Sequence, residues 1–198
     1  MLFMLTHFQE EAERIYNNGQ KAVVPAGNAG RQTGAGIYVL RGFRQWNREV
    51  STMWDCAMTI DSDVWNGWNK IWLPRFFEFP EDKEKDPQTC KPRDLYGMKV
   101  IQKADGFHDS EKDRARFLQY LDPSYTVDNT VIFSDVVSHN DKAQCYIPDG
   151  LVKTNQIWLT PCTERLAKDS ERLGVEFGTA EWDLTSLPGW GLGVELPQ

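Results

Sequence analysis

The chain has 198 residues, 40% of them hydrophobic and 26% charged, which is typical of a single globular domain with a sizeable core. Its net charge of −7 argues against a protein that binds nucleic acid mainly through a general positive field. No apolar stretch is long enough to span a membrane, and the short apolar run at the N-terminus is followed at once by acidic residues. We therefore expect a cytoplasmic protein without a membrane partner.

The first twenty residues contain the clearest local pattern. Leu2–Leu5 is apolar and of strand length, and the polar pair Thr6-His7 follows it. Residues 9–18 carry apolar side chains at helical spacing, and Gly19 is placed to end that helix. The pattern predicts a strand that runs directly into a short helix.

A glycine-rich loop at 27–36 leads into an apolar strand at 37–40. No Gly-Lys-Ser/Thr follows the loop, and it precedes a strand rather than a helix, so it is neither a P-loop nor a dinucleotide fingerprint. Residues 42–54 have apolar positions at helical spacing and are predicted as a helix. Three arginines near its start form either a local basic face or an ordinary solvated one: Arg41, Arg44 and Arg48.

The rest of the chain mixes short strands with a few helices. We predict strands at 58–60, 71–80, 96–103, 130–133, 144–147 and 156–159. We predict helices at 110–121 and 163–173, and loops at 81–94 and 138–142. Because the helices are not regularly interposed between strands, the pattern favours an α+β fold. Residues 1–198 are expected to form one domain, with the tail 174–198 packed on its body.

Four cysteines are scattered along the chain without a Cys-x-x-Cys pair: Cys56, Cys90, Cys145 and Cys162. This spacing favours reduced thiols over a disulfide framework or a zinc knuckle. The three histidines have no partner at metal-ligand spacing, and the segment that begins with Asp61-Ser62-Asp63 does not fit a calcium loop. The sequence therefore predicts no metal.

Three blocks near the N-terminus occur in a distinctive order: Thr6-His7, Ile15 to Gly19, and Gly34-Ala35-Gly36-Ile37-Tyr38. This order resembles the NAD-binding core of ADP-ribosyltransferases of the diphtheria-toxin and poly(ADP-ribose) polymerase type. In that family a strand with a polar His/Thr motif is followed by a helix ending in Ile-x-x-x-Gly and by a Gly-x-Gly-Ile-Tyr strand. The opening Leu-Phe-Met-Leu-Thr-His-Phe is similar to the DarT toxins, which ADP-ribosylate DNA bases.

Two later segments are similar to the same family. Residues 142–150 resemble its last catalytic strand, and residues 116–122 with Phe133 resemble the stretch before that strand. The resemblance implies a split antiparallel sheet with short flanking helices. It also implies a toxin that uses NAD as substrate without a metal, transfers ADP-ribose to a nucleic acid or, less favoured, a protein, and is neutralised by an antitoxin protein.

The resemblance also assigns roles to residues. It implies two catalytic positions, with Tyr38 stacking on the nicotinamide and position 144 steadying the developing cation. The residues that it implies for NAD binding are Thr6, His7, Gly34, Gly36 and Arg41. The segment 134–143 would select the acceptor. Read without the resemblance, Tyr38 is a core aromatic side chain and Gln144 an ordinary polar residue of a strand.

Position 144 departs from the family, which has a catalytic Glu where this chain has Gln144. Glutamine can still form hydrogen bonds, but it brings no negative charge to a cationic transition state. The loss of one charge-matched contact costs about 3–4 kcal/mol, or roughly two to three decades in rate. Three explanations stay open: an inactivating Glu-to-Gln change, a natural protein that only binds, or an acid from elsewhere, such as Glu171 or Glu176.

Smaller departures occur in the first strand, where Met4 replaces the histidine of DarT-like chains and Phe8 replaces the glycine of the polymerase type. The acidic composition is also consistent with a function from another class. The chain could be an acidic interaction or inhibitor protein, for example one that mimics nucleic-acid charge, and it would then need neither NAD nor a cleft. An RNA 2′-phosphotransferase would share the core, but its pair of basic residues cannot be located here.

Overall fold

The computed structural model describes residues 2–24, 33–40, 53–85, 91–97, 100–103, 106–136, 139–160, 162–164 and 182–194. The helices are α1 (Gln9–Asn17), α2 (Ser62–Gly67), α3 (Pro80–Lys85), α4 (Ser110–Leu121) and α5 (Asp149–Val152), with one 3-10 turn at Leu184–Ser186. The strands are β1 (Leu2–Phe8), β2 (Gly36–Leu40), β3 (Met53–Ile60), β4 (Asn69–Trp72), β5 (Phe76–Phe77), β6 (Arg93–Asp94), β7 (Val100–Lys103), β8 (Gly106–Asp109), β9 (Thr130–Val136), β10 (His139–Pro148), β11 (Ile157–Leu159) and β12 (Thr163–Glu164). The mixed α+β fold class predicted from the sequence is confirmed.

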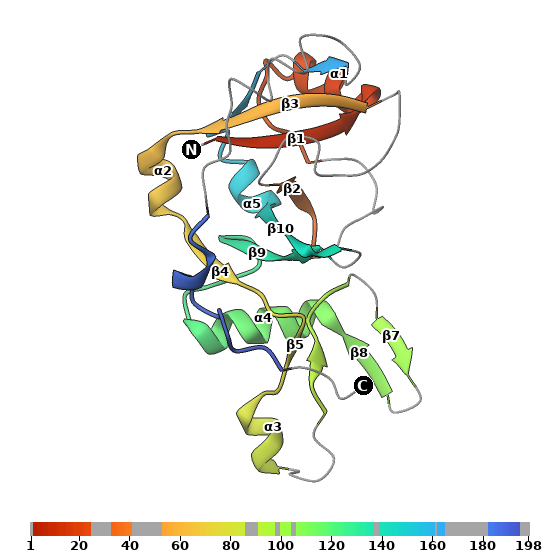
Figure 1. The fold of residues 1–198 in the computed structure, drawn as a ribbon, viewed down its shortest axis with the longest axis vertical. Helices are drawn as coiled ribbons and strands as arrows, with labels where there is room; N and C mark the ends of the chain where they lie inside the picture. Colours follow the sequence, from red (N-terminus) through yellow and green to blue (C-terminus); the bar gives the residue numbers. More distant parts are fainter. Residues whose placement is uncertain are drawn as a thin grey trace.

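Among these residues the main sheet has eight strands in the order β11-β3-β1-β2-β10-β9-β4, and β12 also pairs with β3. Its pairings are antiparallel except that of β4 with β9, which is parallel. The strands β1 and β2 meet where Met4 lies opposite Leu40, whereas β1 and β3 are paired along their length. In Figure 1, β1 and β3 lie with α1 at one end of the molecule, and β2, β10 and β9 lie nearer the middle.

The strands β2, β10 and β9 are covered on both faces. Alternate side chains of β10 point to opposite faces, so Cys145 and Ile147 pack in one core and Tyr146 in another. The first core also receives Met58 of β3 and Ile15 of α1. The second core lies toward α4 and consists of Tyr146 with these buried partners: Ile71, Leu73, Phe77, Phe79, Leu95, Tyr96, Phe117, Leu118 and Ile132.

Local sequence signals explain where three of the helices begin or end. The helix α1 ends at Asn17, and Gly19 follows with a positive φ of 65°, a conformation that glycine adopts easily. In α4, Glu111 and Asp113 lie in the first turn, where negative charge suits the helix dipole, and Phe117 and Leu118 are buried. In α2, the Asp61 carboxylate accepts hydrogen bonds from the Asp63 and Val64 backbone nitrogens, so it serves as an N-cap.

Both edge strands of the main sheet are covered by other backbone. At β11, the Ala22 nitrogen donates to the Ile157 carbonyl and the Leu159 nitrogen donates to the Gln20 carbonyl. At β4, the Trp72 nitrogen donates to the Pro188 carbonyl, and the Trp190 ring lies 4.6 Å from that of Trp72. The segment 182–194 therefore packs on the body and protects an edge that would otherwise be open to pairing.

Five local predictions are wrong. The expected strand at 71–80 is divided among the end of β4, the separate strand β5 and the first residue of α3. Residues 53–54, expected at the end of a helix, begin β3, and residues 163–164, expected at a helix start, pair with β3 as β12. The expected loop at 81–94 contains most of α3 and all of β6, and the expected loop at 138–142 contains the start of β10. At 53–54 and 163–164, pairing with a distant segment overrides the local pattern, whereas the start of β10 pairs with the preceding strand β9.

Candidate functional site

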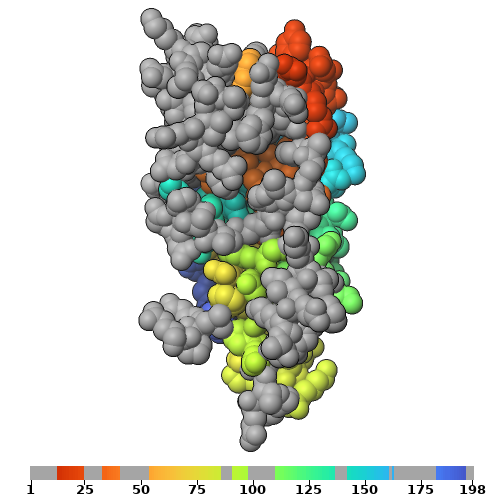
Figure 2. All heavy atoms as spheres, turned by 90° about the vertical axis from the view of Figure 1, so that its right-hand side faces the viewer, coloured from red at the N-terminus to blue at the C-terminus, as the bar shows by residue number. Residues whose placement is uncertain are grey.

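The strands that carry the resemblance to ADP-ribosyltransferases are consecutive in the sheet. The strand order places β1, with Thr6-His7, next to β2, with Tyr38, and β2 next to β10, with Gln144. The register aligns Met4 with Leu40 and Leu40 with Gln144. Residues widely separated in the sequence thus come together in one part of the sheet. Figure 2 shows atoms of β2 and of the β9–β10 region at the surface near the middle of one face.

Tyr38 and Gln144 lie on the same face of β2 and β10. Tyr38 lies opposite Tyr146, and Gln144 is two residues before Tyr146 on the same strand. The Tyr38 and Tyr146 ring centroids are 5.1 Å apart. The structure therefore brings together the two residues predicted as catalytic.

Gln144 is buried, with only 1% of its surface exposed. Its side-chain nitrogen donates a hydrogen bond of 3.3 Å to the hydroxyl of Ser134, which lies opposite it on β9. Ser134 is itself fully buried. The side-chain amide of Gln144 is therefore buried and bonded within the protein. A ligand can reach it only if this side chain becomes accessible.

The Tyr38 hydroxyl organises the turn that precedes its own strand. It accepts hydrogen bonds from the backbone nitrogens of Thr33, at 2.8 Å, and Gly34, at 2.9 Å, and it donates to the Gly34 carbonyl. Burial raises the pKa of this phenol, although its hydrogen bonds with Thr33 and Gly34 oppose the shift. The hydroxyl thus already has hydrogen-bond partners within the protein, and the half-buried ring is the part of Tyr38 that could contact a ligand.

Gly34 and Gly36 make room for Tyr146. A Cβ on Gly34 would lie 2.6 Å from the Tyr146 hydroxyl oxygen, and one on Gly36 would overlap the Ile147 carbonyl and lie 2.6 Å from the Tyr146 ring. Gly34 also has a positive φ of 137°. The Tyr146 hydroxyl donates to the Ala35 carbonyl at 2.9 Å. Packing against a neighbouring side chain is therefore sufficient to require both glycines.

A second polar group lies beside Ser134. The Tyr96 hydroxyl donates to the Leu73 carbonyl at 3.0 Å and accepts from the Asp135 nitrogen at 3.2 Å. Burial, and next the Asp135 carboxylate, raises the pKa of Tyr96. The buried Arg114 donates to the carbonyls of Leu95 and Gly97. These contacts fix the segment 95–97 against the face that carries Gln144.

Sequence reasoning missed Tyr146, Ser134, Tyr96 and Arg114. Alternation along the predicted strand 144–147 puts Tyr146 on the face of Gln144, so its position was readable from the sequence. The others had no such signal, because their contacts depend on tertiary packing. Position 134 and the 139–143 segment, predicted as an acceptor-selecting loop, belong to β9 and β10, whose register shifts between His139 and Ala143.

The remaining predicted residues are placed only in part. Thr6 and His7 belong to β1, where they lie opposite Asp55 and Trp54 of β3. Their side chains are outside the described part of the structure, and so are Arg41, Arg44, Arg48, Glu171 and Glu176. Their predicted roles therefore stay predictions.

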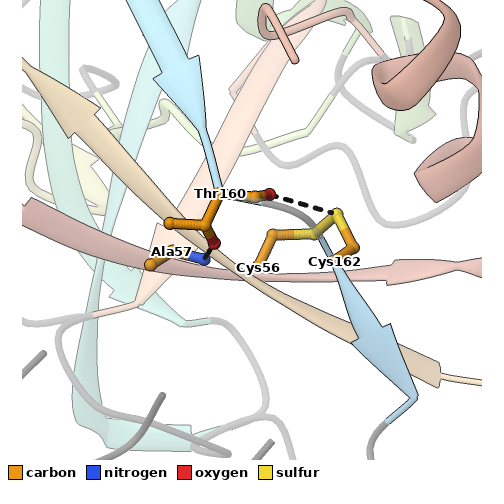
Figure 3. Close-up of a disulfide and its surroundings, with 4 residues drawn as sticks. All are labelled: Cys56, Ala57, Thr160 and Cys162. Atoms are coloured by element: carbon orange, nitrogen blue, oxygen red, sulfur yellow. Dashed lines mark hydrogen bonds between the residues drawn. A yellow bond between two sulfur atoms is a disulfide. The ribbon is translucent and has the colours of Figure 1, made fainter. Parts of the chain in front are cut away.

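The prediction of reduced thiols is wrong for two of the four cysteines. Cys56 and Cys162 form a disulfide, with Cα atoms 4.4 Å apart and a sequence separation of 106 (Figure 3). Beside it, the Ala57 nitrogen donates to the Thr160 hydroxyl at 3.0 Å, and the Thr160 nitrogen donates to the Ala57 carbonyl. The pairing of β11 and β12 with β3 brings the two cysteines together, which no local spacing could indicate. Cys145 is a buried free thiol, and Cys90 lies outside the described residues.

Comparison with known protein families gives one match. The family model covers residues 31–189 and is described as a family of unknown function, DUF5910. The chain belongs to DUF5910. No curated protein matches it, and no solved structure does. The matched part of this DUF5910 chain includes β2 and β10, with Tyr38 and Gln144, but it begins after β1 and α1.

A separate pocket of about 520 Å³ lies beside the disulfide of this DUF5910 chain. Glu13, Ile15 and Tyr16 of α1 line one side, and Trp54, Thr160 and Cys162 line another. Tyr38, Gln144, Gly34 and Gly36 do not line it. The pocket and the Tyr38–Gln144 face are therefore distinct places in the fold.

Two searches of the described residues concern other kinds of site. No group of three or more histidine, cysteine or acidic side chains there is arranged to hold a metal ion. In the same part of the chain, no helix combines the length and the apolar character needed to cross a membrane.

Proposed function

We propose that this protein is an ADP-ribosyltransferase that uses NAD as substrate and a nucleic-acid base as acceptor. The observation that supports the proposal is the strand order β1-β2-β10, which makes neighbours of three of the segments that resemble the family. Chance resemblance of three separate segments does not require them to be adjacent in space. The common face of Tyr38 and Gln144 supports the same function.

In this proposal each residue has a limited role. The half-buried ring of Tyr38 offers an apolar surface on which a nicotinamide ring can stack, while its hydroxyl keeps the turn at 33–35 in place. Gln144 offers an amide oxygen to a ribose hydroxyl. It lacks the negative charge that would stabilise the cation formed as the bond between ribose and nicotinamide breaks. We therefore expect turnover roughly two to three decades below that of a chain with Glu at this position.

Burial of Gln144 sets a condition on catalysis. The side chain is 1% exposed and bonded to Ser134, so contact with NAD requires that this contact opens or that the residues over it move. Binding of NAD through this face should therefore change the surroundings of β9 and β10. An NAD-dependent change in the amide signals of residues 134 and 144 would report this opening directly.

The test compares NAD cleavage and label transfer by the chain with Gln144 and by Gln144→Glu, with DNA, RNA and protein as acceptors. The matched control is Gln156→Glu, which makes the same chemical change at an exposed position outside this face. We expect Gln144→Glu alone to increase NAD cleavage, and the acceptor that takes the label identifies the substrate. If neither Gln144→Glu nor the chain with Gln144 binds or cleaves NAD, the proposal is wrong.

A folding control must accompany this test, because Gln144→Glu puts a carboxyl group in a buried position. Burial raises the pKa of a carboxyl group and favours its neutral form. The variant should therefore lose more stability at pH 7 than at pH 4.5, relative to the chain with Gln144. NAD assays are meaningful only where the near-ultraviolet circular dichroism of the variant is native.

A second candidate is a protein of this fold that binds a partner without catalysis. The burial of Gln144 and the engagement of the Tyr38 hydroxyl favour it, because both side chains already have partners within the protein. An antitoxin partner is an expectation of the transferase proposal alone. The Cys56–Cys162 disulfide weighs against the cytoplasmic location expected from the sequence, since disulfides persist mainly in oxidising compartments.

A further inference from the structure

One cysteine of the Cys56–Cys162 disulfide lines a pocket, and the other is enclosed in the core. The pocket has a volume of about 520 Å³, within the range of roughly 300–1,000 Å³ found for ligand pockets. Cys162 belongs to its lining and is partly exposed, whereas Cys56 has no exposed surface. The two ends of the disulfide therefore differ in access, and a molecule in the pocket approaches Cys162 rather than Cys56.

Access decides which sulfur of a disulfide reacts with a thiol. In thiol–disulfide exchange a thiolate attacks one sulfur, and the other sulfur leaves. Attack on Cys162 forms a new S–S bond at that residue and breaks its bond to Cys56. The electron pair of the broken bond passes to the Cys56 sulfur, which then takes up a proton from water. The sulfur of the incoming thiol is oxidised and that of Cys56 is reduced, so the step needs no other oxidant or reductant.

The other side chains of the pocket favour a thiol that carries an apolar ring. Ile15 of α1 is a buried aliphatic residue of the lining, and Tyr16 and Trp54 are aromatic ones. Tyr16 is 70% exposed, so much of its surface is open to a ligand. A ring that packs against these residues replaces water there, and it raises the concentration of the attached sulfur near Cys162.

The wall that carries Cys162 has other connections to β3. The Ala57 nitrogen donates to the Thr160 hydroxyl, and the Thr160 nitrogen donates to the Ala57 carbonyl. The residues after Cys162 pair with β3 as β12. These contacts do not depend on the S–S bond, so we expect the wall to stay in place when that bond is exchanged.

We propose that Cys162 is a modification site for small neutral thiols that carry an apolar ring. Such a thiol binds in the pocket with its ring against Tyr16 and Trp54 and exchanges with the disulfide. The products are a mixed disulfide at Cys162 and a thiol at Cys56. The site does not depend on the proposed transferase activity, because Tyr38 and Gln144 do not line the pocket.

The test treats the full chain, with the disulfide intact, with benzyl mercaptan or 2-mercaptoethanol, two neutral thiols of similar acidity. Oxygen is excluded, so that an adduct forms only by exchange, and samples are quenched with acid before a second thiol removes the adduct. Peptide mapping without reductant then locates the adduct. We expect it on Cys162, formed roughly tenfold faster with benzyl mercaptan at equal thiolate concentration. An adduct on Cys56, equal rates for the two thiols, or no reaction of the folded chain would overturn the proposal.

A pair of variants tests whether the pocket causes the difference between the two thiols. Tyr16→Ala should remove most of the rate advantage of benzyl mercaptan and leave the reaction with 2-mercaptoethanol unchanged. Tyr120→Ala removes another exposed tyrosine, on α4, and should preserve the advantage. If the advantage survives Tyr16→Ala, or is lost equally in Tyr120→Ala, the ring does not bind in this pocket and the proposal fails. NAD cleavage measured on the same samples distinguishes this failure from failure of the transferase proposal.

Discussion

Tyr38 of β2 and Tyr146 of β10 lie opposite each other in the sheet, with ring centroids 5.1 Å apart and ring planes inclined at 48°. Both hydroxyls bind the turn that precedes β2: that of Tyr38 contacts Thr33 and Gly34, and that of Tyr146 contacts Ala35. The turn and the two strands therefore depend on one another for their conformation.

Tyr38→Phe should lower the free energy of unfolding by about 1–3 kcal/mol, because it leaves the Thr33 and Gly34 nitrogens without the acceptor that they share. Tyr146→Phe is the matched control, since it removes one contact, to the Ala35 carbonyl, and should cost about 1 kcal/mol or less. Urea denaturation of both variants measures the difference. A smaller loss for Tyr38→Phe than for Tyr146→Phe would contradict the role assigned to its hydroxyl.

Gly36→Ala should destabilise the protein by about 2 kcal/mol or more, because the new methyl group would overlap the Ile147 carbonyl, which belongs to the paired strand and cannot rotate away. Gly67→Ala makes the same change at the end of α2, where no atom lies within 4 Å of the added carbon, and should be close to neutral. Thermal unfolding of the two variants provides the comparison. Equal melting temperatures would show that β2 and β10 are not packed as described.

Stability should fall as the pH rises above about 10, the pKa of tyrosine in an unfolded chain. Burial raises the pKa of Tyr96 and Tyr146 in the folded protein, so above pH 10 the folded state binds more protons than the unfolded state. Unfolding then releases protons and becomes more favourable as the pH increases. Tyr96→Phe should flatten this dependence between pH 9 and 11 in denaturation experiments, even though it lowers stability throughout. An unchanged slope would mean that Tyr96 ionises normally.

Reduction of the Cys56–Cys162 disulfide should lower the free energy of unfolding by about 2–4 kcal/mol. The bond closes a long loop, and its removal enlarges the ensemble of unfolded conformations. Peptide mapping without reductant should recover the two cysteines in one linked fragment. Cys145, which is fully buried, should not react with thiol reagents until the protein unfolds. Recovery of Cys56 as a free thiol would contradict the structure.

Local patterns predicted the elements whose conformation is decided locally. The strand at the N-terminus, the helix ended by Gly19 and the helix from Ser110 to Leu121 all have periodic side chains and clear end signals. The apolar runs at 37–40 and 144–147 likewise predicted that Tyr38 and Gln144 lie on strands. Neither the Ser134 contact nor the burial of Gln144 could be predicted, because both depend on how β9 and α4 pack against β10.

Predictions failed where distant segments pair. Residues 53–54 and 163–164 have locally plausible helical surroundings, yet they belong to β3 and β12, where Trp54 lies opposite Glu164 and Asp55 opposite Thr163. The same pairing brings Cys56 to Cys162, so one long-range contact accounts for two errors in secondary structure and one in cysteine chemistry. A single sequence offers no measure of such contacts, because secondary-structure propensity is judged from residues that are close together in the sequence.

The strand order of the main sheet has a consequence for how the protein is made. During synthesis β1, β2 and β3 leave the ribosome first, but the neighbours that complete the sheet around them, β10, β11 and β12, come from residues 139–164. The edge at β4 is then covered by residues 182–194. Until those segments emerge, the apolar faces of the early strands have no permanent cover, and they are exposed to chaperones and to mispairing. Such dominance of long-range pairing is typical of slow folding, so completion of this sheet should be a late step of folding.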